Sequence, residues 1–369
     1  MIVTLGLVGA VGANVWLTDL VYNDLPQAPL PPMDPIAGGL DSATCGGCHT
    51  QIHSAWKLSA HGRAHLDPLY LADFRDQGEP YVCEYCHTPL VEQRAQVVSG
   101  LWMAWPAFVP QTTANPRHDP ALRTDGIGCV ACHQRDGAMI GPFEAQGSPP
   151  HPTRKEALGV ELCRPCHFLD LKVGSELPRP IQDTFGEWEE YRRLGGEKDC
   201  IECHMPRTEP VPVALGGPPR LGRDHRLKGP TDVNFLRSGL VVRAVEFGDQ
   251  TATVTLYNGS GHRLPTAEPQ RRVEVILEAL DGRGAVIASA SESLQRVILL
   301  PKLIESADTT LRPREERTLA LHVTADSARS LRVRVVFHLW DPDHHVARAA
   351  GLREEALRVP VFSQTKALP

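Results

Sequence analysis

The sequence predicts an α+β protein, with a mostly helical and irregular segment followed by a small antiparallel β-sandwich, and with an apolar helix at the N-terminus. Two observations support this division. From about residue 236 onward, apolar and polar residues alternate with a period of two, as in half-buried strands. Before that point strand signals are nearly absent, and the chain instead carries five copies of one cysteine motif in a background rich in proline (32) and glycine (31).

The repeated motif is C-x-x-C-H, and its five copies use all ten cysteines of the chain. It is the attachment signature of a c-type haem. Two thiols at this spacing reach the two vinyl groups of one porphyrin, and the following histidine becomes the proximal ligand of the iron. Zinc sites would pair two C-x-x-C units per metal and leave one over, and disulfides would need no histidine. The sequence therefore predicts five covalently attached haem c groups, held by Cys45, Cys48, His49, Cys83, Cys86, His87, Cys129, Cys132, His133, Cys163, Cys166, His167, Cys200, Cys203 and His204.

The second axial position of each haem decides its chemistry, because a second histidine closes the iron for electron transfer and an open position permits substrate binding. Eleven further histidines can supply distal ligands. His61 follows the first motif on a predicted helix, with His65 and His53 as competitors for the same role. The predicted distal ligands are His61, His118, His151, His225 and His262.

The other four predicted ligands have different surroundings. His118 and His151 lie in proline-stiffened loops upstream of the third and fourth motifs, which suits a ligand that must be placed in advance. His225 follows the fifth motif. His262 lies in a glycine-containing turn at 258–266, and we expect this turn to cap a haem and to pin the sandwich to the haem domain. The alternative is an ordinary turn histidine between two strands.

The N-terminal segment 1–22 is largely apolar up to Asp19, slightly short of the roughly 20 residues that span a bilayer. No Lys or Arg precedes Lys57, and no small-residue cleavage site follows the apolar run. We predict an uncleaved membrane anchor, with a cleaved signal peptide as the alternative. Residues 23–40 are rich in proline and are predicted to form an extended tether.

The remaining domain boundaries follow from the spacing of the motifs and from the change of residue pattern near 236. Motifs some 34–46 residues apart leave too little chain to enclose each porphyrin with an ordinary core, so the haems themselves become the core of a domain over 41–230. Helices are expected at 49–61, 63–76, 154–166 and 184–194. The β-sandwich is placed at 231–362 and a tail at 363–369.

The chain resembles the multihaem cytochromes c related to the tetrahaem cytochrome of nitrification and to hydroxylamine oxidoreductase. This resemblance implies that His61 and His225 are distal ligands. The turn at His262 is similar to a G-H-x-x-P-T-G element of β-modules appended to such cytochromes, with Ala267 where glycine is usual. The matching stretches are Trp56-x-x-Ser59-x-His61, Asp125-Gly-Ile-Gly before the third motif, Thr184-Phe-Gly-Glu-Trp188, the fifth motif with Met205-Pro206, and His225 to Gly229.

Two departures weigh against an enzyme of that group. No motif has the C-x-x-C-K form of ammonia-forming nitrite reductases, and the haem sites are fewer than in hydroxylamine oxidoreductase-type enzymes. An anchored chain with five haems also resembles, in architecture, the cytochrome subunits of quinol-oxidising membrane complexes. The net charge of −6 gives no nucleic-acid signature.

We therefore predict a non-enzymatic electron-transfer protein with mainly bis-histidine haems. Haem attachment to C-x-x-C-H takes place outside the cytoplasm, so the protein is expected on the periplasmic side, anchored to the inner membrane. Its expected partners are a quinol oxidoreductase, other cytochromes or a terminal reductase. The alternatives are an oxidoreductase with one open haem that acts on a small nitrogen or sulfur compound, and a subunit of a larger respiratory complex or filament.

Overall fold

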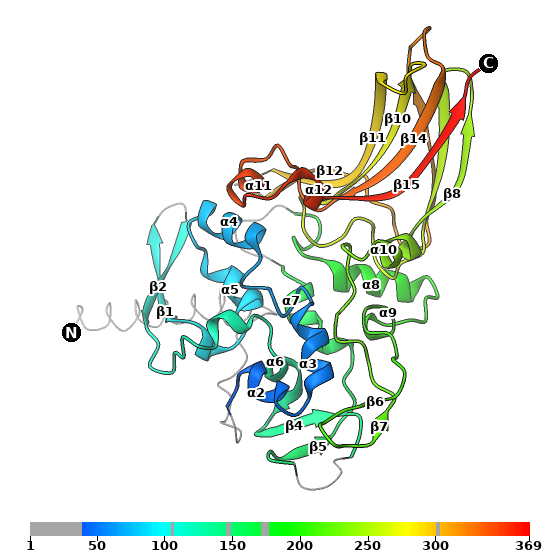
Figure 1. Cartoon of the computed structure of the whole chain (residues 1–369). Coiled ribbons are helices and arrows are strands. Elements are labelled where there is room, and N and C mark those ends of the chain that lie inside the picture. The colour runs from blue at the N-terminus through cyan, green and yellow to red at the C-terminus, as the bar shows by residue number, and fades with distance from the viewer. Residues whose placement is uncertain (1–38, 105–106, 145–148, 171–176, 300–302) are drawn as a thin grey trace. The chain divides into compact units, whose positions relative to one another are not determined.

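The structure is a computed structural model that describes residues 39–104, 107–144, 149–170, 177–299 and 303–369 (Figure 1). The chain forms two compact units. The first contains the residues up to 169 together with 201–227, and the second contains 170–200 and 228–369. Helices dominate the first unit and long antiparallel strands the second, so the predicted α+β class is confirmed.

No helix in the described ranges is long and apolar enough to cross a membrane. The predicted anchor at 1–22 and nearly all of the predicted tether at 23–40 lie outside the described residues.

The helices of the first unit are short and begin at local signals. Asp67 caps α4, because its carboxylate accepts the amide hydrogens of Leu69 and Tyr70 while Pro68 occupies the first helical position. The helices are α2 (Ser42–Gly46), α3 (Thr50–Lys57), α4 (Pro68–Asp76), α5 (Tyr81–His87), α6 (Cys129–His133) and α7 (Arg164–His167), with α9 (Cys200–His204) where the two units divide. The predicted helices at 49–61 and 63–76 are thus confirmed in shorter form. The predicted helix at 154–166 is replaced by the end of β5, a single 3₁₀ turn at Val160–Leu162 and the first residues of α7.

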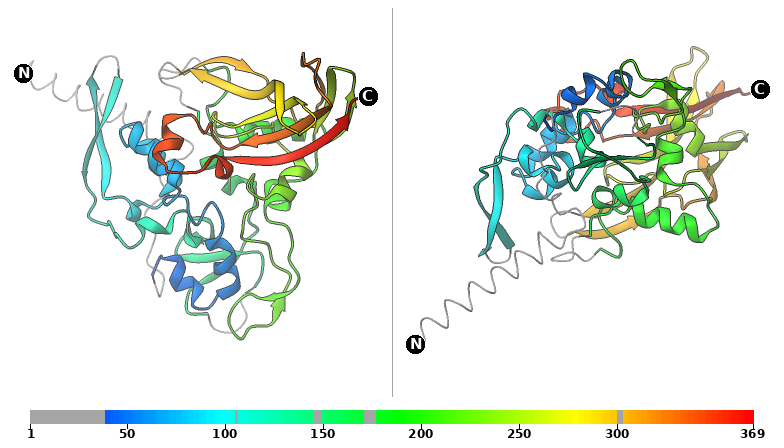
Figure 2. Two further views of the ribbon diagram at one scale, coloured as in Figure 1. Left: turned by 45° about the horizontal axis from the view of Figure 1, so that its top comes forward. Right: turned by 90° about the horizontal axis from the view of Figure 1, so that it is seen from below.

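The expectation that strands are nearly absent before residue 236 is wrong. β1 (Gln96–Ala104) and β2 (Ala107–Ala114) form an antiparallel hairpin, drawn as a cyan ribbon in Figure 2. The β-branched run at 97–98 and the threonines at 112–113 favour this hairpin. The other strands of this part of the chain are very short and form where loops meet, so no local sequence pattern predicts them. They are β3 (Gln134–Arg135), β4 (Ala138–Gly141), β5 (Thr153–Lys155), β6 (Val211–Pro212) and β7 (Pro219–Arg220).

The second unit contains two antiparallel sheets. The five-stranded sheet has the order β12-β11-β10-β14-β15 and the three-stranded sheet has the order β13-β9-β8. Strands β10, β11, β14 and β15 run side by side (Figures 1 and 2). The bounds are β8 (Leu240–Phe247), β9 (Thr251–Asn258), β10 (Arg272–Leu280), β11 (Val286–Leu299), β12 (Ile304–Asp308), β13 (Glu316–His322), β14 (Ser330–His338) and β15 (Arg358–Ala367).

Alternation along the strands builds one core between these sheets. Val254 on β9, Val275 on β10 and Val333 on β14 are fully buried and belong to one hydrophobic cluster. Every second residue of a strand faces the same side, so the period of two read from the sequence becomes the apolar inner face. β15 extends past the predicted boundary at 362, because it pairs with β14 as far as Ala367.

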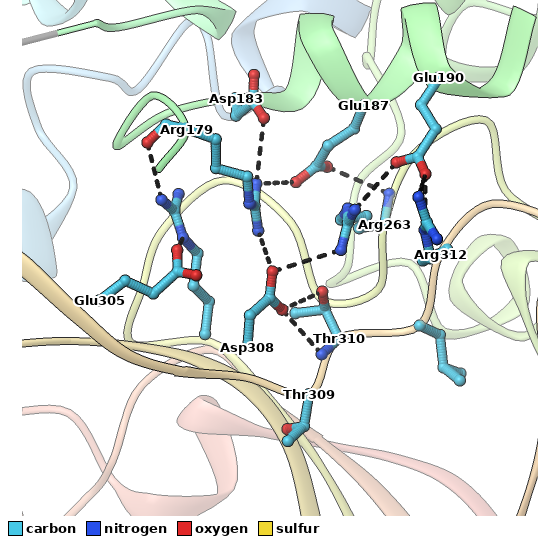
Figure 3. A network of polar contacts seen from close by, with 12 residues as sticks. Arg179, Asp183, Glu187, Glu190, Arg263, Glu305, Asp308, Thr309, Thr310 and Arg312 are labelled. Carbon is cyan, nitrogen blue, oxygen red and sulfur yellow. Dashed lines mark hydrogen bonds and ion pairs between the residues drawn. The ribbon is translucent and has the colours of Figure 1, made fainter. Parts of the chain in front are cut away.

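The structure also groups residues 170–200 with the second unit, although the sequence placed them in a domain over 41–230. The physical reason is a network of ion pairs around α8 (Thr184–Arg193), shown in Figure 3. The Arg179 guanidinium lies 2.8 Å from Glu187, 3.3 Å from Asp183 and 3.0 Å from Asp308. Asp308 also accepts from Arg263, at 3.4 Å.

Further bonds of the network reach the loop between β9 and β10. Glu187 accepts from the backbone N–H of Arg263 at 3.2 Å and from the hydroxyl of Thr266. Arg296 on β11 is buried, pairs with Glu305 at 2.7 Å, and donates to the backbone carbonyls of 179–181. Side chains of α8 and of the sheet thus hold residues 177–193 on the second unit.

Removal of the central cation tests this network. We expect Arg179→Met to lower the free energy of unfolding by about 3–5 kcal/mol, because it leaves the buried Glu187 carboxylate without its cation. Arg312→Met is the matched control, since Arg312 also pairs with a glutamate of α8 but is 63% exposed, and its loss costs less than about 1 kcal/mol. Urea unfolding followed by circular dichroism of the strands compares the two; equal losses would contradict a buried network.

Asp183 gives the second unit a pH dependence. Burial and the neighbouring Glu187 carboxylate raise the pKa of Asp183 to about 6. The folded state therefore binds this proton more tightly than the unfolded chain does, and stability falls as the pH rises from about 4 to 6. We expect Asp183→Asn to flatten this slope and to raise the free energy of unfolding at neutral pH by about 1 kcal/mol. Unfolding curves across this pH range measure both effects, and an unchanged slope would contradict the assignment.

Candidate haem-binding sites

Each cysteine motif in the structure coincides with a short helical turn. The backbone N–H of His49 donates to the carbonyl of Cys45 at 2.8 Å, and His167 makes the same bond to Cys163 at 3.0 Å. Residues four apart lie on the same side of a helix, so the turn places the first cysteine and the histidine of a motif on one side. The second, third and fifth motifs lie within α5, α6 and α9.

Backbone carbonyls fix three of the motif imidazoles. The Nδ1 atoms lie 2.6 Å from the carbonyl of Val213 for His49, 2.6 Å from that of Ala64 for His87, and 2.9 Å from that of Ile140 for His133. Since a carbonyl only accepts, each Nδ1 carries the hydrogen. The lone pair is then on Nε2, which is the tautomer that a metal ligand requires.

Three motif imidazoles face a second imidazole from a distant part of the first unit. The ring centroids are 6.5 Å apart for His49 and His151, 6.3 Å for His61 and His167, and 6.2 Å for His133 and His225. All six residues come from the set of motif and distal histidines predicted from the sequence.

This spacing fits an axially coordinated haem iron. A bond from imidazole nitrogen to a first-row metal such as zinc is about 2.0 Å, and with roughly 1.1 Å from nitrogen to ring centre on each side the centroids would lie about 6.2 Å apart. In the described part of the chain no group of three or more side chains could hold a bare metal ion. A pair of imidazoles suits a metal whose other four positions are filled by a macrocycle.

Burial favours the neutral form of three of these imidazoles, which is the form that a metal ligand requires. Burial, together with the neighbouring His204 and His87, lowers the pKa of His61 to about 4. Burial likewise lowers the pKa of His133 and of His225 below its usual range.

The second motif is different. The ring packed on His87 is the phenol of Tyr70, parallel to it with a centroid distance of 3.7 Å and an interplanar angle of 6°. Within the described chain no imidazole pairs with His87 at the spacing seen in the three pairs. The Tyr70 hydroxyl and the Nδ1 of the nearby His65 are buried and have no hydrogen-bond partner among the described residues.

The remaining candidate histidines lie in three different surroundings. The Nε2 of His118 is buried without a partner in the described structure, and its backbone N–H donates to Asn115 at 3.2 Å. His53 packs on Trp56 with ring centroids 5.5 Å apart. His262 belongs to the second unit, on the loop after β9, where Asn258 donates to its carbonyl at 2.8 Å. Ala267, in the same loop, adopts the left-handed φ of +69° that glycine adopts without strain.

Thiols of different motifs lie next to one another. Cys45 of the first motif lies beside Cys129 of the third, and this neighbour lowers the pKa of the Cys129 thiol to about 7. Cys166 of the fourth motif lies beside Cys86 of the second, which raises the pKa of the Cys166 thiol. Burial and the charge of Cys166 raise the pKa of Cys132 to about 11. The attachment points of the first four sites therefore form a connected series in the first unit.

Sequence reasoning missed two kinds of residue at these sites. The carbonyls of Val213, Ala64 and Ile140 fix the motif imidazoles, but a backbone carbonyl leaves no trace in residue identity. Tyr70 was also missed, because an aromatic residue on a short helix has many ordinary uses. Tyr70 lies within the helix predicted at 63–76, which in the structure is α4 and is capped by Asp67.

No protein-family model matches the chain, and no curated protein matches it. Among solved structures it is similar to a penta-haem cytochrome c552 from Thermochromatium tepidum, with a TM-score of 0.66 and 20% sequence identity over 91% of this chain and 100% of that one. The chain has the fold of a multihaem cytochrome c. A β-glucuronidase of glycoside hydrolase family 2 also matches, over 36% of this chain and 11% of that one at 10% identity, but its TM-score of 0.16 carries no argument.

This fold agrees with the predicted haem c cofactors, while their number remains a prediction from the motifs. The likeness to the hydroxylamine oxidoreductase-related group, the appended β-module and the individual ligands also remain predictions.

Proposed function

We propose that this protein is a penta-haem c-type cytochrome that relays electrons through mainly bis-histidine haems. The observation that carries the proposal is the set of three facing imidazole pairs at 6.2–6.5 Å. An iron with two imidazole ligands has no position left for a substrate, so its chemistry is limited to electron exchange. The fold shared with a penta-haem cytochrome supports the same function.

The residues of this chain take simple roles in the proposed relay. The ten motif cysteines would attach the haems, which supply the redox change when bound. The distal ligands His151, His61 and His225 would close the first, fourth and third sites opposite the motif ligands His49, His167 and His133. The carbonyls of 64, 140 and 213 hold the proximal rings in place. His118 and His262 retain their predicted role as distal ligands.

Contacts between the motifs support an order for the relay. Cys45 lies next to Cys129, which would make the first and third sites neighbours. The charge of Cys166 raises the pKa of Cys132, so the third and fourth sites would also be neighbours. Cys166 lies next to Cys86, which would place the fourth site beside the second. His204 of the fifth motif is close enough to His61 to lower its pKa. Electrons would pass between neighbouring sites without proton transfer or bond making.

The setting of the relay is also proposed. The protein would lie on the periplasmic side, held to the inner membrane by residues 1–22, because c-type haems are attached outside the cytoplasm. It would exchange electrons with a quinol oxidoreductase, other cytochromes or a terminal reductase. The apolar N-terminal segment and the five motifs support this placement.

Removal of single distal ligands tests the relay. We expect His61→Ala, His151→Ala and His225→Ala each to convert one haem from low spin to high spin, because each removes one imidazole of a facing pair. EPR and optical spectra of the purified holoprotein report the change. His322→Ala is the control, since His322 is exposed on β13. A pair variant with the wild-type spectrum would contradict the proposed ligation.

The second site favours a second candidate function, an oxidoreductase with one open haem. No imidazole in the described chain lies at the pair spacing from His87, and the buried hydroxyl of Tyr70, which stacks on His87, and the buried Nδ1 of His65 have no partner among the described residues. Arg123, which pairs with Glu84 at 3.1 Å, adds a positive charge beside them. Such groups would suit a small nitrogen or sulfur compound.

Cyanide separates the two candidates, because it binds a ferric haem that lacks a sixth ligand. A fully closed relay predicts no cyanide binding by the wild type and, if His118 closes the second site, binding of about one equivalent by His118→Ala. An open second haem predicts about one equivalent already in the wild type, unchanged by His118→Ala. Optical titration of the oxidised holoprotein gives the stoichiometry.

A further inference from the structure

The first haem site has an exposed edge. Cys48 is exposed, whereas the other nine motif cysteines are partly covered. Leu215 is 75% exposed, more than any other large apolar side chain in the described part of the chain. These two residues are in direct contact, because the backbone N–H of Leu215 donates to the carbonyl of Cys48 at 2.7 Å.

Leu215 is held at the tip of a rigid turn. Residues 211–220, named here the 211–220 turn, begin with β6 and end with β7, which pair with each other. The N–H of Gly217 donates to the carbonyl of Ala214 at 2.9 Å, and Gly216 takes the φ of +74° that this turn needs. Because the carbonyl of Val213 also accepts from His49 at 2.6 Å, the turn is bound to the last two residues of the first motif.

This turn is apolar except for Arg220 at its end. Residues 210–219 read PVPVALGGPP and contain no charged or polar side chain. Exposed apolar residues continue beside it, with Leu221 at 52% and Phe143 at 48% exposure. The guanidinium of Arg220 lies 5.7 Å from the centroid of the Phe143 ring, so Phe143 is in contact with the end of the turn. The cores of protein interfaces are depleted of charged residues in the same way.

We propose that the 211–220 turn is the docking surface on which a one-electron carrier protein with an apolar contact face exchanges electrons with the first haem. This inference rests on the proposed electron relay. One electron leaves the reduced carrier, which is oxidised, and reduces the ferric iron of the first site, or the reverse. No bond breaks and no proton moves.

The features of the turn favour this occupant. Its contacts with Cys48 and His49 place anything bound to Leu215 next to a haem attachment edge, and electron transfer slows steeply with distance. An anionic membrane surface attracts clusters of Lys and Arg, and residues 210–219 contain none. A second copy of the chain could also bind to this turn, and the experiment below distinguishes a dimer from a complex with a carrier protein.

The first arm of the test measures whether position 215 is coupled to a haem. All native cysteines are in haem motifs, so Leu215→Cys provides one thiol for a photoactive ruthenium label. We expect flash-driven haem reduction from this label to be about tenfold faster or more than from the same label on Val286→Cys, an exposed position of β11. Equal rates would overturn the assignment of an electron port.

The second arm measures docking, with the reduced holoprotein and two acceptors. Oxidised mono-haem cytochrome c is the protein probe and ferricyanide the small one. We expect Leu215→Asp to slow the reaction with the cytochrome about tenfold and that with ferricyanide less than about twofold, because a charge at the centre of an apolar contact weakens docking only. Val286→Asp is the control and should change neither rate.

The outcomes separate the possibilities. The wild-type rate with the cytochrome should change less than about threefold between about 0.05 and 0.5 M salt, because the contact is uncharged. A steep salt dependence, or no effect of Leu215→Asp, would overturn the docking surface. Size-exclusion chromatography that shows a dimer lost in Leu215→Asp would assign the turn to a second copy instead. If neither acceptor oxidises the wild type, the electron relay itself is wrong.

Discussion

The distance between two facing imidazoles is the constraint on which the first unit depends. Each pair joins segments far apart in the chain, as His49 with His151 and His133 with His225, and leaves between them the space that one coordinated metal requires. The aliphatic core there is small: one cluster is built on Leu90, Val130 and Ala131. Cofactors therefore have to supply much of the cohesion, and short helices suffice because each only has to present one ligand.

The second unit is stabilised in a different way. Its two sheets bury a large apolar cluster, and its residues 177–193 are held by ion pairs around Arg179. Buried ion pairs contribute little net stability but are costly to break. They accordingly act here as a specific attachment, which holds α8 and the loop after β9 in one arrangement (Figure 3).

The three imidazole pairs and the second site together give the protein its chemical character. Where an imidazole faces an imidazole, the iron would be closed and only an electron can pass. At the second site Tyr70 stacks on His87, and its buried hydroxyl has no hydrogen-bond partner in the described chain. The largely apolar 211–220 turn adds a third element, a surface hydrogen-bonded directly to the first cysteine motif.

The sequence by itself determined what depends on neighbouring residues. The C-x-x-C-H motifs specify haem attachment within five residues, and the period-two alternation specifies β8, β9, β10 and β14, since both signals are local. The same reasoning proposed His61, His151 and His225 as distal ligands, but it could not say which haem each would serve. The expected absence of strands before residue 236 was wrong, because the local pattern that favours the β1–β2 hairpin was overlooked and the shorter strands form where distant loops meet. The structure groups residues 170–200 with the second unit through ion pairs between residues far apart in the chain.

Only the tertiary structure decided how the ligands are combined. It brings His61 to His167 rather than to the first motif beside it, and His225 to His133 rather than to the fifth. It also placed the carbonyl of Val213 on His49 and the ring of Tyr70 on His87. Such pairings depend on which distant segments the fold brings together. The identity of a residue does not show which side chain its backbone carbonyl or its ring will contact.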